Sequence, residues 1–284
     1  MRIDHVLVTR FNLPSEGAEK LIRAQDGWLR DRIELFERYT VPSVRSQSAT
    51  AFHWIVYLDV ESPQWLLDRL RPLADDGLLT PLFRETVDWA DLAADARTVT
   101  RARGDILLTT NLDNDDALAT NFVERLQAAV RPGVRESIFL GRGLIVSGAK
   151  VYRRTDRMNA FCSVAEPWDG AQTAWRDWHI LLGKHMPSRV LAGAPAWLQV
   201  IHGRNVSNRV RGWLTSPDRY VALFPGQLDG LPALGLAEQL ADRMVYMPLR
   251  EARELVRVLA KSILLRLLGK DGLSRLSERL QRIR

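Results

Sequence analysis

The chain has 284 residues, 46% of them hydrophobic and 26% charged, which is enough for one large α/β domain or for a domain with an appendage. Its single cysteine, Cys162, excludes an intrachain disulfide and a cysteine-based metal site, and it favours a reducing, cytoplasmic compartment. No apolar run is long enough for a signal peptide or a membrane span. The net charge of +6 lies in residues 249–284 alone, so the rest of the chain is neutral, which argues against a nucleic-acid-binding core.

The first two predicted elements are a strand and a helix. Ile3 to Thr9 (IDHVLVT) is typical of a buried strand, and Arg10 follows at its carboxyl end. At that place Arg10 is either a contact for a phosphate or carboxylate or an ordinary loop residue. Trp28 to Tyr39 has apolar residues at helical spacing, which predicts a helix with one buried stripe. Pro42 interrupts this pattern, which resumes from Val44 to Ala51.

A second strand is predicted from Phe52 to Leu58 (FHWIVYL), a run rich in aromatic and β-branched residues. Asp59 closes this strand and is either a contact for the base or ribose of a nucleotide or an ordinary turn residue. The pattern then predicts a helix, a short strand and another helix, at Trp65–Leu73, Leu78–Phe83 and Leu92–Arg103.

The most informative stretch runs from Asp105 to Asp116 (DILLTTNLDNDD). Its apolar start predicts a buried strand, and its polar end lies where open α/β sheets bind their ligands. Asp113 and Asp115 can present two hard oxygen ligands to Mg²⁺ or Mn²⁺, an ion that substrate phosphates would complete. The simpler interpretation is that Asp115 or Asp116 caps the helix that follows, but one cap needs one residue, and three carboxylates exceed that need.

Strands and helices alternate from the first residue to this stretch, which predicts an α/β fold with a parallel, doubly wound sheet. The usual phosphate loops are missing, because no G-x-G-x-x-G follows the first strand and no Walker lysine motif occurs. A nucleotide on this sheet would therefore have its phosphates held through a metal ion, which agrees with the aspartate cluster.

Beyond the helical pattern that ends near Val130, the periodicity of the chain is less regular. A polar-aromatic segment at 159–168 has no clear period, and a helix is predicted from Trp175 to Leu182 with Asp177 in its first turn. Strands are predicted at Ser137–Leu140, Leu144–Arg153 and Ala196–Ile201, the last ending in His202.

Five segments, which together span about residues 3–210, carry a family resemblance. They read VLVTRFNL, WLRDRIELFERYTVPSVRSQSATAFHWIVYLD, TTNLDNDDAL, NAFCSVAEPW and PAWLQVIHGRNVSN. In this order they resemble the GT-A glycosyltransferases, and within them a bacterial rhamnosyltransferase family. The DxD motif alone is weak evidence, whereas its order with the first two segments and the terminal HGxNxSN is specific. The resemblance implies a GT-A, Rossmann-like fold flanked by helices.

The resemblance also implies a donor site with a divalent cation, Mn²⁺ or Mg²⁺. In it, Asp113 and Asp115 match the DxD that holds the cation against the donor's diphosphate, and Asp116 shares that role. His202 resembles the histidine that returns to the metal or diphosphate late in the fold. Contacts to the donor nucleotide are expected from Thr9, Arg10, Asp59 and Asp113.

For the catalytic base the resemblance points to Asp177. Arg176-Asp177-Trp178 resembles the ED-x-x-L segment of related enzymes, although Arg176 stands where that motif has its first acid. The second acid of the motif deprotonates the acceptor hydroxyl. Glu166 is the alternative base.

The implied activity is transfer of a sugar, with L-rhamnose favoured, from a nucleotide-diphosphate donor such as TDP-rhamnose to a hydroxyl of a glycan or lipid-linked acceptor, with inversion. Two alternatives stay open: a metal-dependent nucleotidyl- or phosphotransferase, and an inactive domain that binds nucleotide sugars. The catalytic domain is expected to span residues 1–248. Residues 249–284 form a basic amphipathic helical tail that either contacts the inner face of the cytoplasmic membrane or packs on protein.

Overall fold

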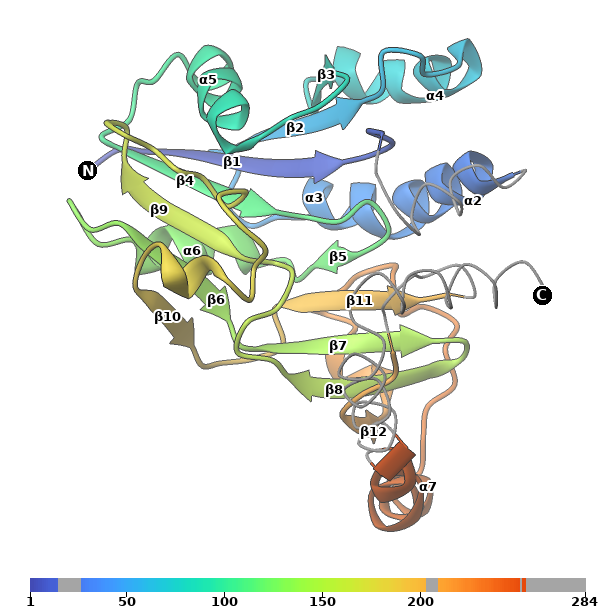
Figure 1. The fold of residues 1–284 in the computed structure, drawn as a ribbon. Helices are drawn as coiled ribbons and strands as arrows, with labels where there is room; N and C mark the ends of the chain where they lie inside the picture. Colours follow the sequence, from blue (N-terminus) through green and yellow to red (C-terminus); the bar gives the residue numbers. More distant parts are fainter. Residues whose placement is uncertain (15–26, 203–208, 251, 254–284) are drawn as a thin grey trace, which may run out of the picture.

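Two β-sheets organise the chain (Figure 1), and the computed structural model describes residues 1–14, 27–202, 209–250 and 252–253. The larger sheet has seven strands in the order β10-β6-β9-β4-β1-β2-β3. Their bounds are β1 Ile3–Arg10, β2 His53–Leu58, β3 Thr80–Phe83, β4 Ile106–Asn111, β6 Glu136–Leu140, β9 Ser163–Pro167 and β10 Ser188–Leu191. The smaller sheet has the order β12-β8-β7-β11-β5, with β5 Ala117–Leu118, β7 Arg142–Ser147, β8 Lys150–Thr155, β11 Trp197–Ile201 and β12 Trp213–Thr215.

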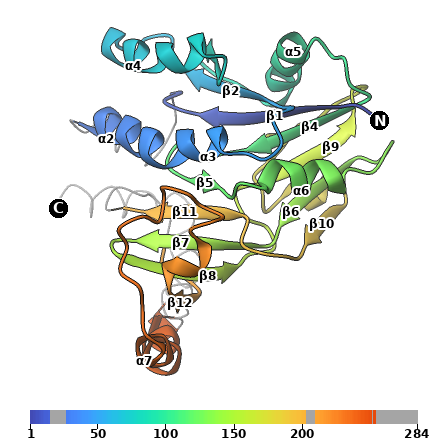
Figure 2. The ribbon, with the colours of Figure 1, turned by 180° about the vertical axis from the view of Figure 1, so that it is seen from behind.

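The helices cover both faces of the larger sheet (Figures 1 and 2). Val6, Val8 and Ile55 pack with Leu92 of α5, whereas the alternate residues Leu7 and Val56 pack toward the opposite face, with α2, α4 and α6. This alternation follows from the two-residue period of a strand buried on both faces. The bounds of the helices on the two faces are α2 Trp28–Leu35, the π-helical η1 Phe36–Thr40, α3 Val41–Arg45, α4 Gln64–Asp75, α5 Trp89–Thr100 and α6 Phe122–Ala129.

The parallel, doubly wound sheet predicted from the sequence is confirmed. β1 pairs in parallel with both β2 and β4, and β2 pairs in parallel with β3. β9 alone runs against its neighbours β4 and β6 in the described sheet. The parallel strands therefore end at one common edge, where the loop that follows β4 meets the end of β1.

The helix that begins at Trp28 does not stop before Pro42. The five-residue π-helical segment η1 leads directly into α3, so that Pro42 lies in the first turn of an α-helical segment, where its missing N–H is tolerated. The helix ends at Arg45, and residues 46–51 do not continue it.

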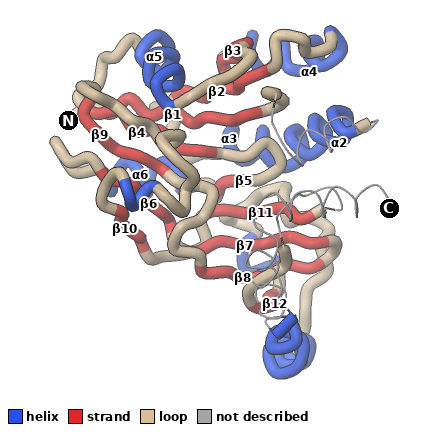
Figure 3. The backbone as a smooth tube through the Cα atoms, in the orientation of Figure 1, coloured by secondary structure: helices blue, strands red, loops and turns tan. Residues whose placement is uncertain are grey.

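Two further expectations are corrected. The predicted strand 144–153 is a hairpin of β7 and β8 that turns at Gly148, whose φ of +56° suits glycine. The predicted helix 175–182 is absent: the segment between β9 and β10 is mainly loop, with a short 3₁₀ helix, η2, at Leu182–Lys184 (Figure 3). The Asp177 carboxylate accepts from the Trp178 N–H at 2.8 Å, a local bond that competes with helix formation.

The last described elements are the 3₁₀ helix η3 Pro217–Tyr220, the helix α7 Leu236–Ala241 and the π-helical η4 Asp242–Tyr246. The helical stretch thus starts at Leu236, before the domain boundary expected at residue 248. Across the described ranges, no helix combines the length and the apolar character that a bilayer crossing requires. Most of the predicted tail, residue 251 and residues 254–284, lies outside the described residues.

Candidate active site

Two asparagines hold the loop after β4 to neighbouring segments through side-chain hydrogen bonds. The Asn111 amide donates to the Ala160 carbonyl at 3.0 Å and accepts from the Trp175 indole N–H at 2.8 Å. The Asn114 amide donates to the Phe11 carbonyl at 2.6 Å, just past the end of β1. Since buried side-chain hydrogen bonds of this kind fix backbone position, the loop holds its aspartates in one arrangement.

Asp115 lies at the centre of this arrangement. It is 5% exposed, and its Oδ2 is 2.6 Å from the Arg32 guanidinium of α2 and 3.0 Å from His202 Nε2. Burial alone would raise the pKa of this carboxyl, but the hydrogen bond from His202 and the charge of Arg32 outweigh it and hold the pKa below its usual value. The predicted meeting of the DxD with His202, from the end of β11, is thus present in the structure.

Asp116 faces away from this centre. It is fully buried, and its Oδ1 accepts from the Val200 N–H of β11 at 2.8 Å, while Oδ2 has no hydrogen-bond partner among the described residues. Burial and the charges of Asp115 and Asp113 raise the pKa of Asp116 well above its usual range. A carboxyl in that environment favours its neutral form, so Asp116 links the loop to the smaller sheet instead of facing a substrate.

Asp113 is the exposed aspartate of the loop, and it lies on the wall shared by two adjoining cavities of about 350 and 320 Å³. The first cavity extends toward Arg10, Trp175 and Asp177. The second extends toward the smaller sheet and is lined there by Arg154, Asp156, Gln199, Arg209 and Arg211. Two cavities that meet at one carboxylate give room for two substrates.

Of the two residues at the end of β1 that were expected to contact the donor, only Arg10 lines a cavity. Arg10 lines the first cavity, and its guanidinium stacks on the Trp175 ring at 4.2 Å, which fixes a positive charge beside Asp113. Thr9 is fully buried, and its hydroxyl accepts from the Trp54 indole N–H at 2.9 Å, so the assignment of Thr9 to donor binding is wrong. Its side chain serves the contact between β1 and β2.

Asp59 forms the turn after β2. Its Oδ1 accepts from the Glu61 N–H at 2.9 Å, and its carbonyl accepts from the Ser62 hydroxyl at 2.7 Å. This geometry matches the simpler of its two interpretations, a turn residue, and Asp59 does not line either cavity beside Asp113.

Asp177 lines the first cavity together with Asp113, although the helix expected around it is absent. Its Oδ2 is 2.8 Å from His185 Nε2, and its Oδ1 accepts from the Trp178 N–H. The hydrogen bond from His185, followed by the one from the Trp178 N–H, lowers the pKa of Asp177. An ionised, partly exposed carboxylate therefore faces the same cavity as Asp113.

Glu166, the alternative base, is excluded by its position. It is fully buried in β9 and pairs with Leu107 near the start of β4, whereas Asp113 follows the end of that strand. Its Oε2 accepts from Arg135 at 2.8 Å and from the Gln172 N–H at 2.9 Å, and its Oε1 accepts from the Thr173 N–H at 2.7 Å. Glu166 therefore orders the loop that follows β9.

Replacing Glu166 with glutamine should lower stability and leave the chemistry of the folded protein unchanged. The amide N–H₂ must face at least one of the three donors, which costs about 1–3 kcal/mol for a buried group left without its partner. Thermal unfolding of E166Q, beside the exposed control E85Q, measures this. A variant with unchanged Tm and reduced turnover would restore Glu166 as a base candidate.

The residues around Asp115 fit a divalent cation in part. Among the described residues no group of three or more His, Cys, Asp or Glu side chains has the arrangement of a metal site. Asp115 Oδ2 and His202 Nε2, however, are 3.0 Å apart, as two adjacent ligands of an octahedral ion are when its bonds are about 2.1 Å long. Carboxylate oxygens suit Mn²⁺ or Mg²⁺, an imidazole nitrogen favours the transition metal Mn²⁺ of the two, and Asp113 is near enough in sequence to supply a further oxygen.

The sequence patterns did not reveal three residues of this site: Arg32, Trp175 and His185. Arg32 lies on the polar side of an amphipathic helix, where arginine is common and carries no signal of its role. Trp175 and His185 occur in a loop without periodicity, so that only the folded chain brings them to Arg10 and Asp177. No local signal identifies them.

One protein family matches most of the chain in its sequence. Residues 4–213 match the profile of a family described as "Putative rhamnosyl transferase". No curated protein matches the sequence.

Solved structures resemble this chain only weakly, with low sequence identity and TM-scores below 0.5. The chain of S. aureus TarS 1–349 in complex with UDP-GlcNAc has 14% sequence identity and a TM-score of 0.44, and the match covers 78% of this chain and 63% of that one. GalNAc-T7 with UDP, GalNAc and Mn²⁺ has 12% identity, a TM-score of 0.42 and coverages of 77% and 48%. The inositol-1-phosphate CTP transferase from T. maritima has 10% identity, a TM-score of 0.38 and coverages of 82% and 99%. This chain spans less than two thirds of the TarS chain.

Proposed function

The chain belongs to the rhamnosyl transferase family whose profile matches residues 4–213, and from that premise we propose that it transfers a sugar from a nucleotide-diphosphate donor to an acceptor hydroxyl. L-rhamnose is the sugar we favour, with TDP-rhamnose as donor and a glycan or lipid-linked acceptor. The observation that carries the proposal is the approach of Asp115 and His202 to 3.0 Å, from positions 87 residues apart, beside the exposed Asp113.

The proposed donor site lies where the carboxyl ends of β1 and β4 meet. Asp113, Asp115 and His202 would hold a divalent cation there, and the cation, when bound, would neutralise the charge that develops on the leaving diphosphate. Arg32 balances the charge of Asp115 from the protein side at 2.6 Å. Arg10, held flat against Trp175, supplies a second fixed positive charge for the donor phosphates. Asp116 positions the loop through Val200 and is not proposed as a ligand.

Asp177 is proposed as the general base. Each carboxylate oxygen accepts one hydrogen bond, from His185 or from the Trp178 N–H, and each keeps a lone pair for a further donor. The acceptor hydroxyl would bind there, lose its proton to Asp177 and attack the sugar carbon in line with the departing phosphate. For a β-configured L-rhamnosyl donor, this single displacement gives an α-linked product with inversion.

The two alternatives from the sequence differ in their products. A nucleotidyltransferase would release pyrophosphate from a nucleoside triphosphate, and an inactive domain would bind nucleotide sugars without turnover. The family match favours the sugar transferase over both. A thermal-shift screen of nucleotide sugars, with and without Mn²⁺, tests the donor site, because binding stabilises the folded state by mass action. Stabilisation by a nucleotide sugar only when Mn²⁺ is present is expected; equal stabilisation in EDTA would contradict a metal-held diphosphate.

We further propose that the C-terminal region places the enzyme at the cytoplasmic face of an anionic membrane. Leu236, Leu240 and Met244 in the helical stretch that leads to this region are 70%, 59% and 74% exposed. The residues after them carry the chain's net charge of +6, and each base near an anionic surface contributes up to about 1 kcal/mol. The beginning of the tail packs on the body, however, because Arg250 pairs with the buried Asp242 at 2.6 Å and with the Gly212 carbonyl.

A truncation that tests this proposal should therefore end after Arg253 and keep the pair of Arg250 and Asp242. It removes eight of the ten basic residues of 249–284 and leaves the described fold complete. We expect the full-length protein to co-sediment with anionic vesicles at low salt and the truncated protein to stay in the supernatant, with transfer to a soluble acceptor unchanged. If the full-length protein does not co-sediment with anionic vesicles, the tail serves packing or dimerisation instead of membrane binding.

A further inference from the structure

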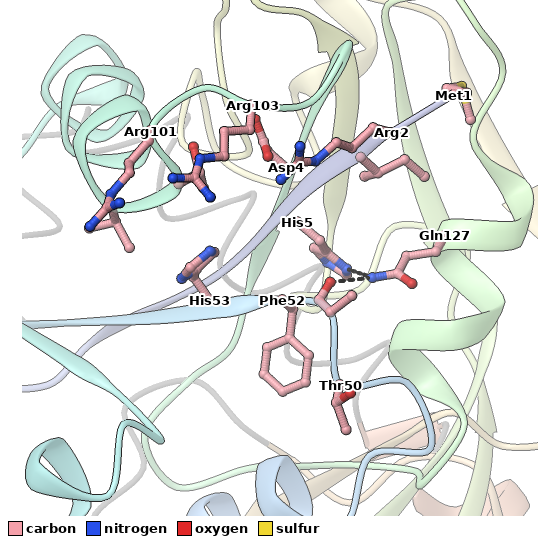
Figure 4. Close-up of a pocket in the computed structure, with 14 residues that line it drawn as sticks. Met1, Arg2, Asp4, His5, Thr50, Phe52, His53, Arg101, Arg103 and Gln127 are labelled. Atoms are coloured by element: carbon pink, nitrogen blue, oxygen red, sulfur yellow. Dashed lines mark hydrogen bonds between the residues drawn. The ribbon is translucent and has the colours of Figure 1, made fainter.

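A further cavity, shown in Figure 4, is lined by the start of β1, whereas the candidate active site lies beyond the end of that strand. Its volume is about 680 Å³, and its walls come from the start of β1, the segment before β2, the turn after α5 and one residue of α6. β1 has eight residues, so its two ends are about 25 Å apart at the rise of an extended strand. A ligand in this cavity cannot contact Asp113.

The cavity wall is strongly basic. Arg2, Arg101 and Arg103 line it together with His53, and within the described residues no hydrogen bond or ion pair engages any of the three guanidinium groups. The one acid in the wall, Asp4, is 7% exposed and accepts from the Gly104 N–H at 2.6 Å and from the Trp168 indole N–H at 3.2 Å. Three guanidinium groups thus line one hollow whose wall contributes a single carboxylate, the buried Asp4.

The backbone that presents these arginines is held in an unusual conformation. Arg101 and Ala102 have φ of +59° and +44°, a left-handed conformation that L-residues with a side chain adopt rarely and at a cost. Gly104 then packs so closely that a Cβ there would lie 2.7 Å from the Asp4 nitrogen. The turn is therefore tied to β1, and it directs Arg101 and Arg103 to the same cavity.

The remaining wall adds polar groups without charge. Thr50, Gln127 and His5 line the side next to α6, where Gln127 contacts His5 Nδ1 at 3.4 Å (Figure 4). Burial lowers the pKa of His5 to about 3, so its ring stays neutral and does not add to the positive charge. Guanidinium groups beside a neutral hydroxyl such as that of Thr50 are groups that bind phosphate oxygens.

We propose that this cavity binds a compound with two or more phosphate groups, separately from the donor site. Guanidinium groups match phosphate oxygens in a two-pronged geometry, and three of them around one hollow favour a multiply charged anion over a single phosphate. The volume exceeds that of one phosphate, and the open edge of the sheet admits either a free phosphate compound or a phospholipid headgroup. The inference does not depend on the identity of the donor sugar.

Calorimetric titration with inorganic pyrophosphate tests the proposal. It is done in EDTA and at low salt, so that no divalent ion can hold pyrophosphate at Asp113 and Asp115. The variant R101Q/R103Q should bind at least tenfold more weakly than the unaltered protein. The matched control R157Q/R219Q removes the same charge from exposed arginines elsewhere and should bind normally.

Two further measurements distinguish this cavity from the donor site and identify the source of the phosphate. Both variants should keep Mn²⁺-dependent binding of the nucleotide sugar, which separates this cavity from the donor site, and should keep the Tm of the unaltered protein. In a second arm, a short-chain, water-soluble cardiolipin, a lipid with two phosphates, replaces pyrophosphate in the same titration, so that the basic tail is offered no vesicle surface: tighter binding than that of pyrophosphate, lost only in R101Q/R103Q, would identify a lipid headgroup as the source of the phosphates. No binding in either arm, or equal loss in the control variant, would overturn the proposal.

Discussion

Replacement of Asp115 by asparagine is expected to abolish Mn²⁺-dependent binding of the nucleotide sugar, with a loss of at least a hundredfold in affinity. The carboxylate is the residue that the structure places against both His202 and Arg32, at 3.0 and 2.6 Å. An asparagine oxygen can still accept from Arg32, but the amide supplies no negative charge for a divalent cation. Calorimetric titration with UDP or TDP, with and without Mn²⁺, measures the effect.

The Asp115 variant needs controls because Arg32 would be left beside a neutral residue, which costs stability when an ion pair is buried. H202Q removes the second proposed ligand and leaves that pair in place, and it should weaken binding in the same Mn²⁺-dependent way. D156N removes another acid from the wall of the second cavity and should bind the donor normally. Donor affinity that is unchanged in D115N, or that is equal in Mn²⁺ and EDTA, would rule out the proposed metal role.

The second large effect is expected at Asp177. D177N should keep the affinity for the donor within about threefold and lower turnover by about 10²-fold or more, because a general base contributes that much to the transfer of a proton. Asp177 lines the cavity that Asp113 shares, whereas the exposed Asp169 in the same loop region does not, so D169N is the matched control. A D177N enzyme with normal turnover would show that another group takes the proton.

His185 gives an independent test of the same assignment. It lowers the pKa of Asp177 through a hydrogen bond at 2.8 Å, so its removal raises that pKa. Because the base must be ionised, the acid limb of the turnover profile should move to higher pH in H185A, with little change at alkaline pH. A structural role for His185 would lower turnover equally at all pH values, and that result would contradict the pairing with a catalytic Asp177.

The parallel, doubly wound character of the larger sheet could be predicted because its signals are local. Runs such as VLVT and WIVYL are buried on both faces, and the helices between them carry single apolar stripes, so the chain alternates visibly between two periods. The DxD loop could be placed for the same reason, because a ligand loop follows the end of a parallel strand. His202 was expected at the metal or diphosphate from a family motif, and its Nε2 lies 3.0 Å from Asp115, while its role there stays a prediction.

The errors occurred where contacts distant in sequence override local patterns. Thr9 and Glu166 are polar residues in segments where site residues were expected. Inside the fold, however, Thr9 accepts a hydrogen bond from Trp54 and Glu166 accepts one from Arg135. The helix expected around Asp177 is absent, and only a fold-level contact brings His185 to that carboxylate. Arg32 has no sequence signal at all, because its partner Asp115 lies 83 positions away.

The most direct test of the account is the reaction itself. The full-length protein is incubated with TDP-rhamnose, Mn²⁺ and a rhamnose-accepting glycan, and the released nucleotide and the glycoside are measured by mass spectrometry and NMR. If the protein is a metal-dependent rhamnosyltransferase, we expect release of the nucleoside diphosphate and formation of an α-linked rhamnoside, both abolished in EDTA and in D115N. Release of pyrophosphate from a nucleoside triphosphate, without glycoside from any nucleotide sugar, would contradict it.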